Sequence, residues 1–150
     1  MPIQSPIFAP AIALVLWSLV MLAWLAATRV PAMARAGIPL MKIVGSRGVN
    51  LEGVVPDRVN WKAHNYAHLM EQPTLFYAVS LMIALLGAAA GDVLAAWIYV
   101  ALRVVHSIWQ ATVNTLSVRF PLFLLSTLAL AYLAYRAIAL TLLADPAVIA

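Results

Sequence analysis

The sequence predicts an all-α protein, a four-helix transmembrane bundle. Of its 150 residues, 65% are hydrophobic and only 9% are charged, whereas a soluble domain is roughly half apolar and about a quarter charged. So few charged side chains cannot cover a soluble protein of this size, which excludes a soluble enzyme, a disordered chain and a nucleic-acid-binding domain. A membrane helix needs about 20 apolar residues, so residues 1–150 hold four spans in a single integral membrane domain.

The first predicted helix covers residues 7–28, a stretch without a charged side chain. It lacks a preceding basic segment and is longer than the roughly 7–15 apolar residues of a signal peptide, so we expect it to be retained. Arg29 and Pro31 are expected to end it. A polar, turn-rich cytoplasmic loop over residues 29–57 follows.

The second predicted helix covers residues 58–90. Its first turns, residues 60–72, are polar, so we expect them to project beyond the bilayer. Pro73 lies inside this helix, where a missing N–H usually produces a kink. Gly91 and Asp92 are expected to form a tight turn to the third helix.

The third predicted helix covers residues 93–115 and the fourth covers residues 119–143. Pro121 then falls in the first turn of the fourth helix, where its missing N–H costs little. Basic side chains gather in the first loop and recur at Arg119, while the turn between the second and third helices carries only Asp92. The positive-inside rule therefore places that loop in the cytoplasm and both termini outside it.

Polar side chains follow one face of the third helix. Arg103, His106, Gln110 and Asn114 are spaced by 3, 4 and 4 residues, a spacing that aligns them on one side. An ionisable group at the centre of a membrane helix costs about 2.5–3.5 kcal/mol. We therefore expect Arg103 to be paired with a carboxylate or a bound anion.

The second helix carries a similar stripe of His64, His68 and Glu71. Glu71 is the only acidic residue between the loop and Asp92, so we predict that it pairs with Arg103. Because the two helices are antiparallel, both stripes can meet in one polar pocket open to the cytoplasm. Purely structural helix–helix pairing is the alternative reading.

A metal site is a further alternative, since His64, His68, Glu71 and His106 are all possible ligands. We assign no metal, because a nearby arginine opposes cation binding. The chain has no cysteine, which excludes disulfides, thiolate metal sites and a cysteine nucleophile.

Two segments resemble the MAPEG family, the membrane-associated proteins in eicosanoid and glutathione metabolism. Residues 65–77 are similar to its second-helix signature, with Glu71 followed by Pro73 and an aromatic run. The second segment runs from Arg103 through the third helix to Arg119. The family has four helices and about this length, so the resemblance covers nearly the whole chain.

The resemblance implies a homotrimer in the bilayer, with glutathione as co-substrate bound between subunits. Arg119 would be the catalytic residue that stabilises the thiolate, and Glu71 would hold the glutathione amino group. The family enzymes commonly have arginine, asparagine and tyrosine where this chain has His64, His68 and Gln110. The residues that the resemblance assigns to glutathione are Arg29, His68, Glu71, Arg103, His106 and Gln110.

The implied function is a membrane-bound glutathione-dependent transferase or peroxidase acting on hydrophobic electrophiles. A fixed cation favours the thiolate of a bound thiol, and the lipid side of the cleft would admit an apolar small molecule. The alternative is a non-catalytic, lipid-binding membrane scaffold of the same fold. The short loops and the Glu-x-Pro variant favour a bacterial inner membrane.

Overall fold

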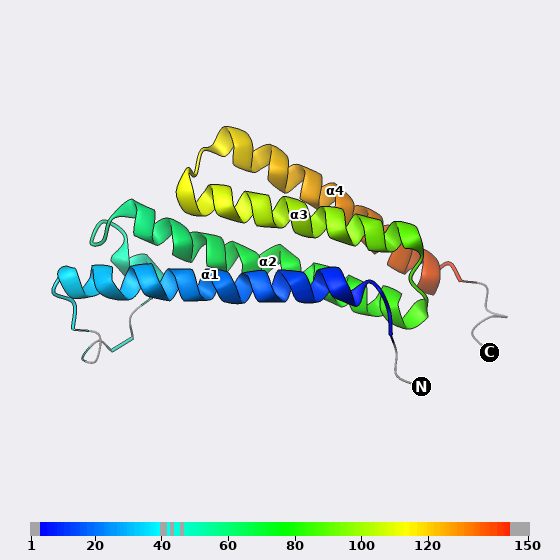
Figure 1. Cartoon of the computed structure of the whole chain (residues 1–150), viewed down its shortest axis with the longest axis horizontal. Helices are drawn as coiled ribbons and strands as arrows, with labels where there is room; N and C mark the ends of the chain where they lie inside the picture. Colours follow the sequence, from blue (N-terminus) through cyan, green and yellow to red (C-terminus); the bar gives the residue numbers. More distant parts are fainter. Residues whose placement is uncertain (1–3, 40–41, 43, 46, 145–150) are drawn as a thin grey trace.

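Four long helices run side by side along the molecule (Figure 1). The computed structural model describes residues 4–39, 42, 44–45 and 47–144, and within them the fold is all-α, as predicted. A short 3-10 helix lies in the loop that joins the first two long helices. The elements are α1 (Phe8–Arg35), η2 (Gly48–Leu51), α2 (Asp57–Leu86), α3 (Ala90–Thr112) and α4 (Leu116–Thr141).

Each of the four long helices is long and apolar enough to cross a membrane. Large apolar side chains cover the outside of the bundle, and Leu19, Leu94 and Leu128 are each more than half exposed. An apolar surface of this extent requires lipid or another protein chain against it. The chain is therefore a multi-pass membrane protein.

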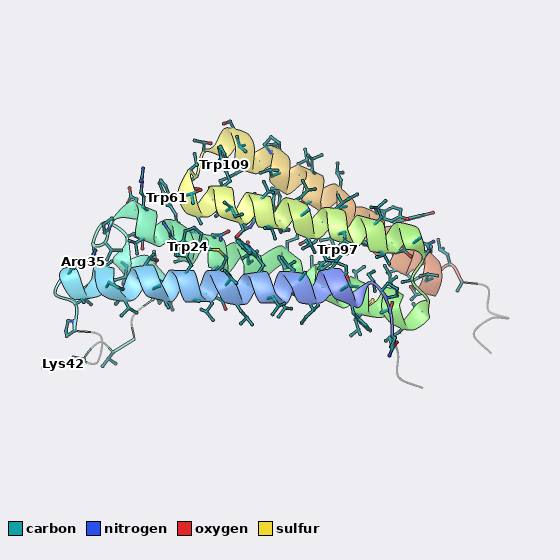
Figure 2. All side chains as sticks on the ribbon, in the orientation of Figure 1. Trp24, Arg35, Lys42, Trp61, Trp97 and Trp109 are labelled. Atoms are coloured by element: carbon teal, nitrogen blue, oxygen red, sulfur yellow. The ribbon has the colours of Figure 1, made fainter. Side chains whose placement is uncertain are left out.

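The two ends of the bundle differ in charge. The start of α1 and the end of α4 lie at one end, and the α1–α2 loop lies at the other (Figure 1). Arg35 and Lys42 are at the loop end (Figure 2). This arrangement matches the charge asymmetry on which the orientation was predicted.

The sequence predicted that α1 ends at Arg29 and Pro31. The helix instead continues through Pro31 to Arg35. Gly37 ends it, with a φ of 70°. The N–H of Gly37 donates to the carbonyl of Ala34, and that of Ile38 to the carbonyl of Met33. These two bonds form a Schellman motif, for which a left-handed glycine is the usual requirement.

The turn between α2 and α3 lies earlier than Gly91 and Asp92. Gly87, with a φ of 103°, ends α2 at Leu86, and α3 begins at Ala90. Asp92 is therefore in the first turn of α3, where its carboxylate accepts the backbone N–H of Ala89 at 3.0 Å. A carboxylate there satisfies an otherwise unpaired N–H and favours the positive end of the helix.

The turn between α3 and α4 is also displaced. α3 ends at Thr112, and Asn114 adopts a φ of 62°, a conformation for which asparagine is enriched. Helix α4 then begins at Leu116, so Pro121 is in its second turn and not its first. Asn114 thus belongs to the turn and not to the predicted helical stripe.

Candidate functional site

Arg103 is at the centre of a polar cluster inside the bundle. It is fully buried on α3. Its Nη2 donates to Gln72 Oε1 at 2.6 Å, its Nη1 lies 3.2 Å from His68 Nδ1, and its Nε donates to the Tyr99 hydroxyl at 3.2 Å. None of the three partners is a carboxylate, so each nitrogen of the guanidinium has a hydrogen-bond partner while its charge remains uncompensated.

The predicted pairing of Arg103 with Glu71 is wrong. In the described part of the chain no ion pair joins the two residues, and Glu71 is exposed. The reason is helical geometry. Gln72 lies four residues after His68 and faces the same inward side of α2, whereas Glu71, one residue earlier, faces the outside. The i+4 relation to His68 was the signal that could have identified Gln72.

Two imidazoles stack beside this cluster. The ring centroids of His68 and His106 are 5.0 Å apart, with an angle of 22° between the planes. Phe123 of α4 is tilted against His68, with the ring centroids 5.5 Å apart, and it also lies 5.4 Å from Arg103 Cζ. Helices α2, α3 and α4 each contribute one ring to this arrangement.

A cavity of about 160 Å³ opens next to the stacked rings. Arg119 lies on its wall and is held by a hydrogen bond of 2.7 Å from its Nη1 to Asn114 Oδ1. Arg119 Nε is buried and has no protein partner. The residues that line the cavity are His68, His106, Leu116, Arg119, Phe120 and Phe123.

The electrostatics of this cavity favour an anion. Arg119 lines it directly, and Arg103 lies one imidazole ring behind it. The ion pairs among the described residues are Asp92–Arg136 and Glu52–His64, so neither cation of the cavity has a carboxylate bound to it. A desolvated cation in this position stabilises negative charge brought by a ligand.

Comparison with known proteins agrees with this architecture. The model of the MAPEG family matches residues 7–139. The chain belongs to the MAPEG family. No match was found among the curated proteins or among the solved structures.

Membership of the MAPEG family fits four membrane helices with a polar site inside them, and it associates the chain with glutathione-related transferase and peroxidase chemistry in general. Of the residues assigned to glutathione by resemblance, His68, Arg103 and His106 are brought together next to Arg119. Glu71 lies on the outer face of α2, one position from Gln72.

Gln110 and a neighbouring buried network lie farther along α3. Gln110 is buried, and its Oε1 has no protein partner. Ser107 accepts hydrogen bonds from Asn65 Nδ2 at 2.7 Å and from Trp17 Nε1 at 2.9 Å. Asn65 and Trp17 lie on α2 and α1, so helical spacing within α3 could not assign them to this network.

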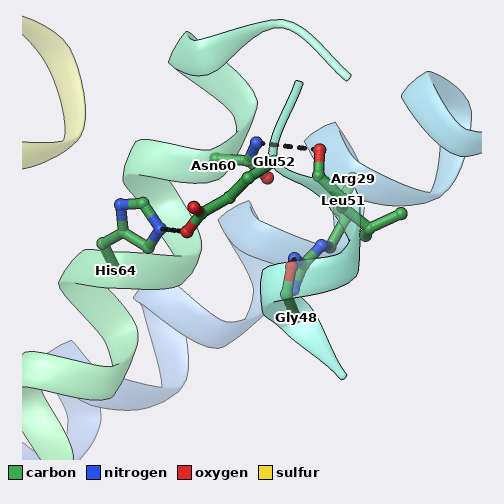
Figure 3. Close-up of polar contacts among 6 residues, drawn as sticks. All are labelled: Arg29, Gly48, Leu51, Glu52, Asn60 and His64. Carbon is green, nitrogen blue, oxygen red and sulfur yellow. Dashed lines mark hydrogen bonds and ion pairs between the residues drawn. The ribbon is translucent and has the colours of Figure 1, made fainter. Parts of the chain in front are cut away.

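Arg29 and His64 are outside the cavity. Arg29 Nη2 donates to the Gly48 carbonyl at 3.0 Å, and His64 Nε2 lies 3.2 Å from Glu52 Oε1 (Figure 3). Both line a second cavity of about 350 Å³ between α1, η2 and α2. Within one chain, therefore, Arg29 does not reach the site of Arg119.

The arrangement of histidines also bears on the metal alternative. His64 is turned toward Glu52, while His68 stacks on His106. Among the described residues there is no group of three or more His, Cys, Asp or Glu side chains placed to hold a metal ion.

Proposed function

We propose that the chain is a membrane-bound glutathione-dependent transferase or peroxidase that acts on hydrophobic electrophiles. The observation that carries this proposal is the cavity at Arg119, where two guanidinium groups without carboxylate partners flank stacked imidazoles. A thiol attacks as its thiolate, and a fixed cation lowers the pKa of the bound thiol. Arg119 is the proposed catalytic residue.

The other proposed contacts divide between two subunits. His68 and His106 line the cavity, Arg103 contacts His68 from α3, and Gln110, buried on α3 with an unpartnered Oε1, is proposed as a further contact. A cavity of about 160 Å³ is smaller than the roughly 300–1,000 Å³ of typical ligand sites, so a tripeptide must extend beyond it. We propose a homotrimer in which the exposed Glu71, together with Arg29 of a neighbouring copy, completes the glutathione site.

The hydrophobic co-substrate would enter from the bilayer. Leu116 and Phe120 line the cavity and are 70% and 60% exposed on the outside of α4. In transfer, the thiolate sulfur forms a bond to an electrophilic carbon, and the displaced electron pair leaves with the leaving group. In peroxide reduction, two thiols are oxidised to a disulfide while the peroxide becomes an alcohol and water.

The proposed orientation places the α1–α2 loop, and the glutathione site near it, in the cytoplasm of a bacterial inner membrane. The cationic end of the bundle, marked by Arg35 and Lys42, supports this orientation (Figure 2). Glutathione would then enter from the aqueous side while the electrophile enters from lipid.

A lipid-binding scaffold is the second candidate, and one feature favours it. A groove of about 630 Å³ lies between α1 and α3, with almost purely apolar walls that include Trp17, Val100 and Val104. The two candidates separate by thermal melting of detergent-purified protein. Stabilisation by glutathione supports the enzyme, whereas stabilisation by lipid alone, with no effect of glutathione or S-alkylglutathiones, supports the scaffold.

A further inference from the structure

The hydrogen bond between Arg103 and His68 fixes the position of the imidazole proton. Arg103 Nη1 lies 3.2 Å from His68 Nδ1. A guanidinium carries only donors, so Nδ1 must accept, and the proton of the neutral ring must be on Nε2. The two ring nitrogens face different sides of an imidazole, so this N–H points away from Arg103.

Gln72 determines the charge behind His68. Its Oε1 accepts from Arg103 Nη2 at 2.6 Å, and its Nε2 donates to Thr127 Oγ1 at 2.9 Å. Because a guanidinium only donates, the oxygen end of the amide must face Arg103, and Thr127, whose hydroxyl donates to the Phe123 carbonyl, accepts from the nitrogen end. A glutamate of nearly the same shape could accept the same bond, but it would neutralise the cation. The amide therefore holds Arg103 in place and leaves its charge to act on His68.

We propose that Gln72 and Arg103 together make His68 a single-tautomer hydrogen-bond donor, its Nε2–H directed at an anionic atom of the ligand in the Arg119 cavity. In the proposed function, on which this inference rests, that atom is the thiolate sulfur of glutathione. Gln72 is a positioning residue that acts through Arg103. A hydrogen bond polarised by a cation is stronger than a neutral one, so the arrangement selects an anionic ligand atom over a neutral one.

A purely structural role for Gln72, joining α2, α3 and α4, makes a different prediction. In that case Gln72→Glu should be harmless, because a carboxylate can bind Arg103 at least as firmly. If Gln72 preserves the charge of the site, the same change should leave stability intact and weaken binding of the anion. The two roles therefore differ in ligand affinity and not in melting temperature.

The tautomer can be measured directly, because the chain has only three histidines. We expect long-range ¹H–¹⁵N spectra of ¹⁵N-histidine-labelled protein in detergent to show His68 neutral, with its proton on Nε2. His64→Ala removes one of the other two signals and so aids assignment. A proton on Nδ1, or on both nitrogens, would overturn the inference whatever glutathione does.

Isothermal titration with glutathione tests the role of Gln72. We expect Gln72→Glu to lower affinity about tenfold or more, as for the loss of a charge-assisted interaction, with a melting temperature no lower than wild type. The matched control is Gln4→Glu, the same change at an exposed position before α1, which should bind like wild type. If Gln72→Glu and wild type bind glutathione with equal affinity, the inference is refuted. If wild type binds no glutathione, the proposed function is refuted, and the histidine spectrum decides the tautomer.

Discussion

The guanidinium of Arg103 donates a hydrogen bond of 2.6 Å to the side-chain oxygen of Gln72, so that a neutral amide of α2 holds a buried cation of α3. An unpaired charge inside a membrane helix is costly. Its retention without a carboxylate is understandable if a ligand supplies the negative charge. This relationship connects the packing of the helices to the proposed binding of a thiolate.

Gln72→Leu should destabilise the protein strongly. The substitution removes the closest acceptor of the buried Arg103, and a buried donor left unsatisfied costs about 1–3 kcal/mol or more when it is charged. Thermal melting in detergent measures the effect. The comparison is Thr127→Val, which removes the outer bond of Gln72 and the hydroxyl's own bond to the Phe123 carbonyl but leaves the acceptor of Arg103 in place. It should cost less, and an equal loss in both variants would mean that Arg103 does not depend on Gln72.

The ion pair at the opposite end of α3 should affect stability without affecting the site. Arg136 Nε donates to Asp92 Oδ1 at 2.8 Å, and the Asp92 side chain is fully buried. Asp92→Ala removes the carboxylate that binds both Arg136 and the backbone N–H of Ala89, so it should melt at a lower temperature than wild type. Asp92→Asn retains an acceptor for the Ala89 N–H and should be the milder variant by about 1 kcal/mol.

Binding at Arg119 should be unchanged in folded Asp92→Asn protein. Asp92 lies eleven residues before Arg103, which is about 16 Å along the helix. A clear loss of glutathione affinity in this variant would show that the two polar clusters of α3 are coupled.

Arg119→Ala should reduce turnover far more than it reduces glutathione binding. The reason is that a cation at the sulfur stabilises the thiolate and the charge that develops in the reaction, and it adds less to binding of the neutral thiol. Steady-state kinetics together with calorimetry separate the two effects. Equal losses in turnover and in affinity would reassign Arg119 to binding alone.

The tether of Arg119 can be removed without changing the backbone. Asn114 holds Arg119 by a bond of 2.7 Å and has a φ of 62°. Asn114→Gly tolerates this φ and removes the acceptor, so turnover should fall modestly while the melting temperature stays near that of wild type. Asn114→Ala should also lose stability, by about 1–2 kcal/mol, because alanine is strained at positive φ; unchanged turnover in both would show that the tether is not needed.

A shared site predicts complementation between two inactive variants. Arg29 does not reach Arg119 within one chain, since it is bound to the Gly48 carbonyl. If Arg29 of one copy completes the site of the next, Arg29→Ala and Arg119→Ala should each be inactive alone. When the two variants are coexpressed in equal amounts and assemble at random, roughly a quarter of the interfaces join an intact Arg29 to an intact Arg119. About a quarter of wild-type activity should therefore return. No recovery would contradict a site that combines Arg29 of one copy with Arg119 of its neighbour.

The number and type of helices could be predicted because membrane spans are the strongest signal a sequence carries. The turns were less predictable. Pro31 was expected to end α1, but a left-handed Gly37 ends it, and Gly87 and Asn114 likewise place the next two turns earlier than expected. In each case a residue able to adopt positive φ determined the boundary, and hydrophobicity alone did not reveal it.

The candidate site was predicted in part. Helical spacing correctly placed Arg103 and His106 on one buried side of α3. The predicted partner of Arg103 was wrong by one residue. Its opposite charge favoured Glu71, but Gln72 is the residue that faces Arg103 on the inward side of α2. Trp17 and Asn65, which meet at Ser107, come from different helices, and periodicity within one helix cannot identify contacts between helices.

Isothermal titration of detergent-purified wild-type protein with glutathione, repeated on Arg119→Gln and with S-methylglutathione, tests the central claim most directly. We predict saturable binding of glutathione to wild type with release of a proton from the thiol, and no proton release with S-methylglutathione or in Arg119→Gln. The absence of binding to wild type even at millimolar glutathione, or binding with no proton release, would contradict the claim that this cavity holds a thiolate.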